Sequence, residues 1–215
     1  MRALELFSGL CGWSRPFAER GHDTFAIDID KHFQADAYLD IGDVTATLAV
    51  IPWRPDIVLA SPPCTSFTTM TMGRNWTHAG EPKTDGAAEG RRLVLAAIRV
   101  IAALRPEFWI IENPRARLRT LGFLDGFERR TVTYCQYGGD NMKPTDLWGV
   151  FPPSLVLKPS CSNGDPCHVA APRGSRTGTQ GGLDGIRAGL IPYPLALAIC
   201  EAAENDLCDR PWEWL

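Results

Sequence analysis

The chain has 215 residues, which is enough for one well-buried domain and short for two. Its 45% hydrophobic and 22% charged residues are typical of an ordinary globular protein, and its formal net charge of −3 excludes a protein that coats nucleic acid indiscriminately. No apolar run approaches the ~20 residues that cross a bilayer, and the N-terminus lacks a signal-peptide pattern. We therefore expect a cytoplasmic protein whose seven cysteines are thiols.

Short apolar runs alternate with helical stretches along the first half of the chain, which is typical of βα units and a mostly parallel sheet. In chain order, the expected elements are strand Ala3–Phe7, helix Trp13–Arg20, strand Thr24–Ile29, helix Val44–Val50, strand Ile57–Ala60, helix Ala87–Leu104, strand Phe108–Glu112, strands Arg130–Cys135 and Leu147–Val150, and helix Tyr193–Glu204. Residues 66–86 show no apolar period. This predicts a structureless, mobile loop that covers a site as a lid. Residues 152–185 are rich in Pro, Gly, Ser and Thr and predict a small recognition module or a connection.

The first expected strand runs into the glycine-containing segment Phe7–Trp13 and then into a helix. Glycines at such a turn let a ligand approach the backbone, and a helix N-terminus offers free N–H groups. Asp28 and Ile29 end the second strand about 20 residues later, where an acidic side chain can hold ribose hydroxyls. Asp43 follows as a candidate contact for an adenine amino group. Surface or capping roles for these acids stay open.

Cys64 stands in the sequence Ser-Pro-Pro-Cys, directly after the apolar run Ile57–Ala60. The two prolines end the strand, which places the thiol where open α/β sheets carry their chemistry. Glu112 closes the strand Phe108–Glu112 in the same way, and the apolar residues before it predict a desolvated carboxyl with a raised pKa. Since one helix separates the two strands, we expect Cys64 and Glu112 to be neighbours. A structural thiol and a solvent-facing strand end are the alternatives.

The segment from Arg91 to Arg130 contains nine arginines, although the first 60 residues are rich in Asp and Glu. A basic stretch on an acidic protein suits local contact with phosphate. A solvated helix face explains the same pattern equally well for any single arginine.

These segments, in this order, resemble the cytosine-C5 DNA methyltransferases, of the compact kind seen in phage genomes. The matched segments are Phe7–Trp13 for the S-adenosylmethionine loop, Pro63-Cys64 for the nucleophile, Glu112-Asn113 for the base-binding carboxylate, Tyr137-Gly138 for the following turn and Leu190–Ala198 for the closing cofactor helix. The resemblance implies a Rossmann-like methyltransferase fold with a mostly parallel seven-stranded sheet. Residues 1–151 would form the catalytic core, 152–185 a very small irregular recognition segment, and 186–215 the helix that completes the cofactor-binding core.

The resemblance also implies methyl transfer from S-adenosylmethionine to C5 of cytosine in DNA, through a covalent bond between Cys64 and C6. Glu112 would hold the N3/N4 edge of a base flipped out of the duplex. Where the family carries arginines, this chain has Lys143 and Thr145, and Lys143 is our candidate to hold O2. The candidate cofactor residues are Phe7, Ser8, Gly9, Leu10, Cys11, Gly12, Trp13, Asp28, Ile29, Asp43 and Pro62. The candidate DNA-binding residues are Ser66, Arg74, Asn75, Arg115, Arg173 and Arg176, with Trp76 as a candidate to contact phosphate or fill the vacated stack.

Two alternatives stay open: the same chemistry on a free cytosine nucleotide, and a non-catalytic DNA-binding relative. Arg187 near the methionine end of the donor raises the further alternative of a carboxylated donor. Cys161, Cys167 and His168 follow no recognised zinc spacing, so loop packing is favoured and no metal site is assigned. We expect a monomer without membrane contact, acting on DNA in the cytoplasm of a bacterial or phage-infected cell.

Overall fold

The computed structural model describes residues 1–68, 72–139, 141–170 and 189–208, so Arg173, Arg176 and Arg187 lie outside the described residues. The strands are β1 (Arg2–Leu6), β2 (Asp23–Asp28), β3 (Ala37–Tyr38), β4 (Ile57–Ala60), β5 (Phe108–Pro114), β6 (Glu128–Thr133) and β7 (Pro144–Val150). The helices are α1 (Ser14–Glu19), α2 (Val44–Val50), α3 (Met72–Asn75), α4 (Asp85–Leu104) and α6 (Tyr193–Cys208), with 3-10 turns η1 (Arg117–Thr120) and η2 (Tyr134–Tyr137). None of these helices is long and apolar enough to span a membrane.

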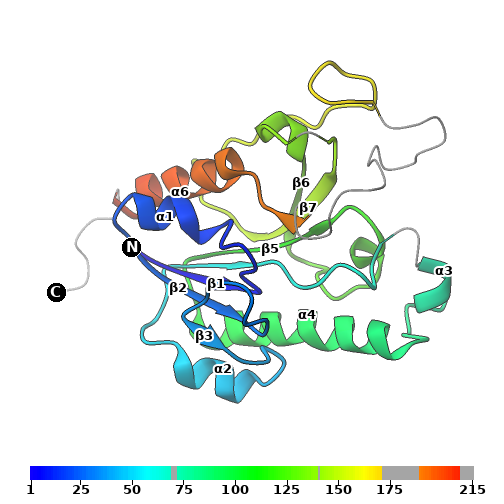
Figure 1. The fold of residues 1–215 in the computed structure, drawn as a ribbon, viewed down its shortest axis with the longest axis horizontal. Helices are drawn as coiled ribbons and strands as arrows, with labels where there is room; N and C mark the ends of the chain where they lie inside the picture. Colours follow the sequence, from blue (N-terminus) through cyan, green and yellow to red (C-terminus); the bar gives the residue numbers. More distant parts are fainter. Residues whose placement is uncertain (69–71, 140, 171–188, 209–215) are drawn as a thin grey trace.

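The strands form one seven-stranded sheet in the order β3-β2-β1-β4-β5-β7-β6 (Figure 1). Strands β3 to β5 in this order are parallel, whereas β7 runs antiparallel to β5 and to β6. The predicted α/β class and mostly parallel seven-stranded sheet are thereby confirmed. The order reverses at β1, since β2 lies on one side of it and β4 on the other. Open α/β sheets bind ligands beyond the carboxyl ends of the strands at such a point.

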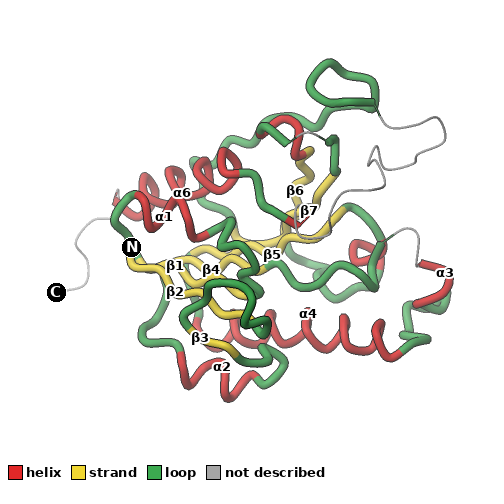
Figure 2. Tube along the Cα trace, viewed as in Figure 1, coloured by secondary structure: helices red, strands yellow, loops and turns green. Residues whose placement is uncertain are grey.

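Helices cover both faces of the sheet (Figure 2). Residues of α1 and α6 pack on one face, and residues of α4 pack on the other. The four residues of β4 are fully buried and alternate between these two cores, as a strand covered on both sides requires. The continuous apolar run that predicted β4 therefore reflects burial on both faces.

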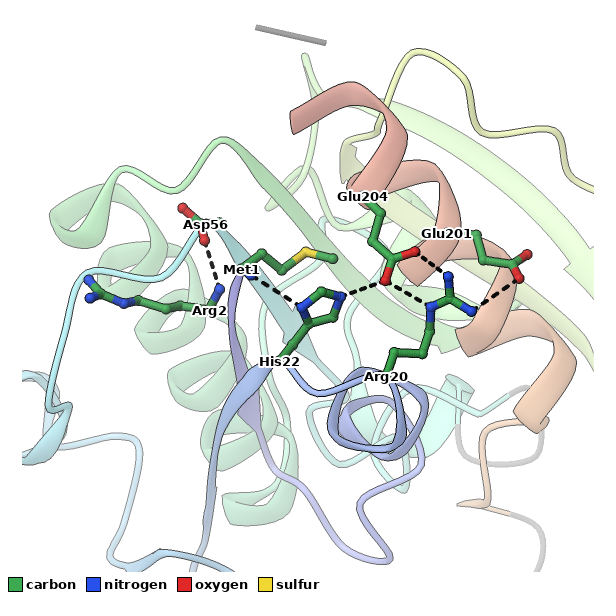
Figure 3. Close-up of polar contacts among 7 residues, drawn as sticks. All are labelled: Met1, Arg2, Arg20, His22, Asp56, Glu201 and Glu204. Atoms are coloured by element: carbon green, nitrogen blue, oxygen red, sulfur yellow. Dashed lines mark hydrogen bonds and ion pairs between the residues drawn. The ribbon is translucent and has the colours of Figure 1, made fainter. Parts of the chain in front are cut away.

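An ion-pair network holds α6 beside the start of the sheet (Figure 3). The Arg20 guanidinium donates to the two carboxylate oxygens of Glu204 at 2.8 and 2.6 Å, and His22 Nε2 lies 2.6 Å from the same carboxylate. His22 Nδ1 in turn lies 3.2 Å from the amino group of Met1. This network anchors the helix whose preceding residues, 189–191, line a cavity of about 360 Å³.

The segment 66–86 contains more structure than the sequence predicted. It includes α3 and an antiparallel bridge between Trp76 and Pro82, and Thr84 caps α4 by accepting a hydrogen bond from a backbone amide. Trp76 is 3% exposed, stacks on Phe67 at 5.5 Å and donates its indole N–H to the Ser66 carbonyl at 2.7 Å. The prediction of a structureless loop is therefore wrong for the described part of this segment. Trp76 is a core residue in this structure.

Several element boundaries differ from the predicted ones by one to four residues, including those of β6 and β7. The expected strand Arg130–Cys135 ends at Thr133, because the chain turns there into η2, and β7 starts at Pro144, three residues before the expected Leu147. The 3-10 turn keeps Tyr134 and Cys135 buried although neither belongs to a strand. The hydrophobic pattern of the sequence alone does not distinguish buried residues of a strand from buried residues of a 3-10 turn.

Gly149 of β7 lies opposite Ile110 of β5, and a Cβ at Gly149 would collide with the backbone carbonyl of Trp109. We expect Gly149→Ala to lower the free energy of unfolding by about 2 kcal/mol or more, because relief requires the two strands to separate. Gly86→Ala is the control: Gly86 is exposed in α4 with open space around its Cβ position, so alanine should be neutral or stabilising. Urea unfolding followed by circular dichroism measures both, and equal stabilities would contradict the close approach.

Candidate active site

The turn after β4 presents Cys64 at the carboxyl end of the sheet. Pro62 is buried, and its carbonyl accepts a hydrogen bond of 2.9 Å from the side-chain amide of Asn113 on β5. Asn113 is fully buried, so this bond ties the ends of β4 and β5 together. The sequence pointed to Asn113 only as the neighbour of Glu112, and its role in holding the Cys64 turn emerges from the structure.

Glu112 lies on β5 beside this turn and is 5% exposed. The Tyr134 hydroxyl donates to Glu112 Oε1 at 2.8 Å, and Lys143 Nζ lies 3.9 Å from the same oxygen. Burial raises the pKa of Glu112, while Lys143 and Tyr134 lower it in part. Tyr134 comes from η2 and Lys143 from the approach to β7, so three separate segments build this carboxylate site. Sequence reasoning missed Tyr134, which no motif or spacing marks.

The charges of Glu112 and Lys143 also affect the pKa of the Cys64 thiol. Burial raises the pKa of Cys64, the Glu112 carboxylate raises it further, and the Lys143 ammonium opposes this shift. Lys143 Nζ also lies 4.3 Å from the centroid of the Tyr134 ring. The strands β4 and β5 pair in parallel, and the Glu112 carboxylate raises the pKa of the Cys64 thiol, so the two side chains lie near each other at the same end of the sheet.

A cavity of about 360 Å³ connects Cys64 to the loop that follows β1. A second cavity of about 300 Å³ shares Phe7, Phe33, Ser61 and Pro63 with the first and extends towards α4. Seven of the predicted cofactor residues line one or both cavities: Phe7, Ser8, Gly9, Leu10, Gly12, Asp28 and Ile29. Lining residues that the sequence did not indicate include Glu5, Phe33, Asp40, Ser61 and Glu89.

The loop after β1 is tightly folded and strongly anchored. Phe7, Gly9 and Cys11 have positive φ values of 58°, 49° and 53°. The Asp28 carboxylate accepts a hydrogen bond of 2.8 Å from the Gly9 amide, so Asp28 shapes this loop. The carboxylate of Glu5 accepts from the first amides of α1, and burial raises the pKa of Glu5 to about 7.

Four other predicted cofactor residues have structural partners. Trp13 is fully buried and donates its indole N–H to Ser61 Oγ at 2.8 Å, which joins the loop to the Cys64 turn. Asp43 caps α2, which was its alternative role in the sequence analysis. The Cys11 thiol lies 3.1 Å from the Gln34 carbonyl, and Pro62 is held by β5.

The predicted DNA-binding residues divide into two groups. Arg74 and Arg115 are exposed. Ser66 is 4% exposed beneath Gly90, and Asn75 donates to the Ser66 carbonyl at 3.2 Å, so both stabilise their own segment in this conformation. Five of the nine arginines in the basic stretch also bind protein groups: Arg91, Arg92, Arg117, Arg119 and Arg130. Much of this stretch is therefore paired within the protein.

Comparisons with known proteins agree with this arrangement. A sequence model of the C-5 cytosine-specific DNA methylase family matches residues 1–120. A Frog virus 3 (isolate Goorha) protein named "Probable DNA (cytosine-5)-methyltransferase" is 31% identical over 172 residues, which cover 76% of this chain and 78% of that protein.

The chain is also similar to solved methyltransferase structures, at low identity. The Entamoeba histolytica methyltransferase EhMeth aligns with a TM-score of 0.52 and 14% identity over 75% of this chain and 57% of its own. The Dnmt2 methyltransferase of S. pombe aligns with a TM-score of 0.43 and 17% identity over 69% of this chain and 48% of its own. The chain thus spans about half the length of these structures. From the family match and the viral relative, the chain belongs to the C-5 cytosine-specific DNA methylases, a family of DNA (cytosine-5)-methyltransferase enzymes.

Proposed function

We propose that this protein methylates C5 of cytosine in DNA, with S-adenosylmethionine as the donor and Cys64 as the nucleophile. The observation that carries the proposal is the convergence of Cys64, Glu112 and Lys143 beside a cavity that the loop after β1 also lines. A nucleophile, an acid and a cation then face one base, next to a pocket for the donor.

The thiol overcomes the low nucleophilicity of cytosine C5. Cys64 Sγ forms a bond with C6 as its thiolate, and the electron pair of the C5–C6 double bond moves towards C5. Once C5 has received the methyl group, its remaining proton passes to a water molecule, the electron pair of that C–H bond re-forms the C5–C6 double bond, and the bond between Sγ and C6 breaks with its electron pair on sulfur. Cys64 is thereby regenerated as the thiolate.

Glu112 and Lys143 stabilise the charge that this addition places on the ring. A buried carboxyl with a raised pKa can share a proton with N3 and accept a hydrogen bond from the N4 amino group. The Lys143 ammonium can donate to O2. Tyr134 holds Glu112 Oε1 in place during these exchanges.

The residues around the two cavities fit an elongated donor with polar and apolar parts. Ser8 Oγ is buried without a hydrogen-bond partner among the described residues and lines the larger cavity. Gly12 packs closely against Ile191, since a Cβ at this position would lie 3.0 Å from the Ile191 Cβ. Phe7 and Phe33 form apolar walls shared by both cavities. When bound, S-adenosylmethionine supplies an electrophilic methyl group.

Because Cys64 and Glu112 lie at the end of a sheet, a base stacked in a duplex does not reach them, and the target cytosine must be flipped out. The exposed residues Arg74 and Arg115 are our candidates for phosphate contacts. We further infer that the protein acts as a monomer in the cytoplasm.

Nucleoside mass spectrometry of duplex DNA incubated with the protein and S-adenosylmethionine tests the proposal. We expect 5-methylcytosine from the wild type and from Cys208→Ser, an exposed control thiol, and a loss of about 10³-fold or more in Cys64→Ser. DNA that contains 5-fluorocytosine should trap the wild type covalently through Cys64, because the proton that must leave C5 is replaced by fluorine.

The other outcomes separate the alternatives. Methylation of a free cytosine nucleotide but not of DNA would identify a nucleotide enzyme. A heavier C5 adduct in cells would identify a modified donor. Folded protein that binds DNA, traps no 5-fluorocytosine and forms no 5-methylcytosine would overturn the proposal in favour of a binding module.

A further inference from the structure

Four metal-ligating side chains meet outside the candidate active site, at the edge of the sheet. Their Sγ and imidazole nitrogen atoms all lie within 4.8 Å of one another. The members of this Cys3His cluster are Cys135, Cys161, Cys167 and His168. The sequence indicated three of them, and the fold adds Cys135, which lies 26 residues before the next member.

The distances within the cluster are close to those of a tetrahedral site. Cys135 Sγ lies 3.1 Å from Cys161 Sγ and 3.6 Å from Cys167 Sγ, and His168 Nδ1 lies 3.8 and 3.4 Å from the latter two sulfurs. Zinc bonds of about 2.3 Å to sulfur and about 2.0 Å to nitrogen, at tetrahedral angles, place two ligand atoms about 3.5–3.8 Å apart. Only small movements of the side chains would therefore bring all four atoms into contact with one ion.

The cluster joins a segment without a core to the catalytic sheet. None of residues 158–170 is buried, and no helix or strand is formed there. The segment nevertheless contacts the edge strand β6 and the turn η2. It includes the yellow loop of Figure 1. Ser160 Oγ donates to the Thr131 carbonyl at 3.0 Å, and the Lys158 amide donates to the Tyr137 hydroxyl at 2.7 Å. Segments that cannot build an apolar core are commonly stabilised by a metal or by disulfides.

We propose that the Cys3His cluster binds one structural Zn²⁺ ion, which holds residues 158–170 against β6 and η2. Three thiolates and one imidazole complete a tetrahedral sphere, so no position is left for substrate or water. Coordination through His168 Nδ1 leaves the proton on Nε2, and the long 3.4 Å contact from the Gly164 amide to Nε2 opens. Cys135 directly follows Tyr134, so the ion also fixes the turn that carries the partner of Glu112.

A second group, His22, Cys200 and Glu204, has similar ligand types but a different environment. The Glu204 carboxylate is already bound by Arg20 and His22, as Figure 3 shows. A metal ion there would have to displace a bidentate guanidinium. The ion pair therefore accounts for that group, whereas no cation accompanies the sulfurs of the Cys3His cluster among the hydrogen bonds and ion pairs of the described residues.

Metal analysis of the full chain, purified under reducing conditions without chelator, tests the proposal independently of methylation. We expect about one zinc ion per chain in the wild type and in Cys208→Ser, the matched control outside the cluster. Cys161→Ser and Cys167→Ser should lose at least about nine-tenths of the metal, since one thiolate ligand is removed. His168→Cys should retain it, because a fourth thiolate completes the same tetrahedral sphere.

Reconstitution of the wild type with Co²⁺ provides a second readout that needs no variant. Tetrahedral thiolate coordination predicts a visible ligand-field band and a thiolate-to-cobalt charge-transfer band, both abolished by added Zn²⁺. Folded, reduced wild-type protein that takes up neither ion would overturn the proposal. So would a disulfide between Cys135 and Cys161 in protein from a reducing cell, or Cys161→Ser retaining zinc like the control.

Discussion

Glu112→Gln should lower the methylation rate by about 10²-fold or more, although it leaves the nucleophile in place. Glutamine keeps an oxygen that can accept the 2.8 Å hydrogen bond from Tyr134, so the geometry around residue 112 is retained. It can neither hold a proton for N3 nor balance the charge that develops when Cys64 adds to C6. The measurement is single-turnover methylation of duplex DNA at saturating donor.

The pH dependence of Cys64 alkylation supplies the discriminating readout. Because the Glu112 carboxylate raises the pKa of Cys64, its removal should move the alkylation midpoint to lower pH. Lys143→Met is the opposite control: the Lys143 ammonium lowers the pKa of Cys64, so its loss should move the midpoint to higher pH. Peptide-level mass spectrometry separates Cys64 from the other thiols.

If Glu112→Gln makes Cys64 ionise at lower pH and yet slows methylation, then Glu112 acts on the cytosine ring and does not activate the thiol. Wild-type methylation by Glu112→Gln would contradict the proposed role. A shift of both alkylation midpoints in the same direction would contradict the electrostatic account of the site.

Arg119→Met should lower the free energy of unfolding by about 3 kcal/mol, because it leaves a buried carboxylate without its cation. Asp146 of β7 is fully buried, and the Arg119 guanidinium donates to its two oxygens at 2.8 and 2.5 Å. Thr131 donates to the same carboxylate at 2.7 Å, but a hydroxyl does not neutralise the charge. Urea unfolding measures the loss.

Arg15→Met is the matched control for this pair. The Arg15–Glu19 ion pair has side chains that are 66% and 46% exposed, so its loss should change the free energy of unfolding much less than the loss of the buried Arg119–Asp146 pair. In addition, Arg119→Met combined with Asp146→Leu should recover part of the stability, because the unpaired charge is then removed. A smaller loss in Arg119→Met than in Arg15→Met would contradict the assignment.

Several features of the site could be predicted from the sequence because they depend on short stretches of chain. An apolar run followed by two prolines places Cys64 at a strand end, and the same reasoning places Glu112. The alternation of runs predicted the parallel strands β1, β2, β4 and β5. Connections between parallel strands are almost always right-handed, which leaves few possible arrangements. The sheet class and the neighbourhood of these two residues follow from such local patterns.

Predictions from the sequence were wrong for segments whose structure depends on contacts with residues far away in the chain. Residues 66–86 have no apolar period, yet Trp76 packs on Phe67 and against the core beneath α4. A single aromatic contact of this kind has no periodicity to detect. The arginines from Arg91 to Arg130 likewise suggested a phosphate-binding face, but the fold supplies acidic partners such as Asp40 and Asp146 from other elements.

By itself, the sequence determined the α/β class and the strand-end positions of Cys64 and Glu112, since strand periodicity and proline punctuation act over a few residues. Only the tertiary structure decided that Tyr134 and Lys143 meet Glu112, and that Cys135 joins the cysteines and histidine of residues 161–168. These groups lie 22 to 33 residues apart along the chain and meet because β7 inserts between β5 and β6. Strand pairing of this kind is decided by the free energy of the whole packed sheet, which no local pattern records.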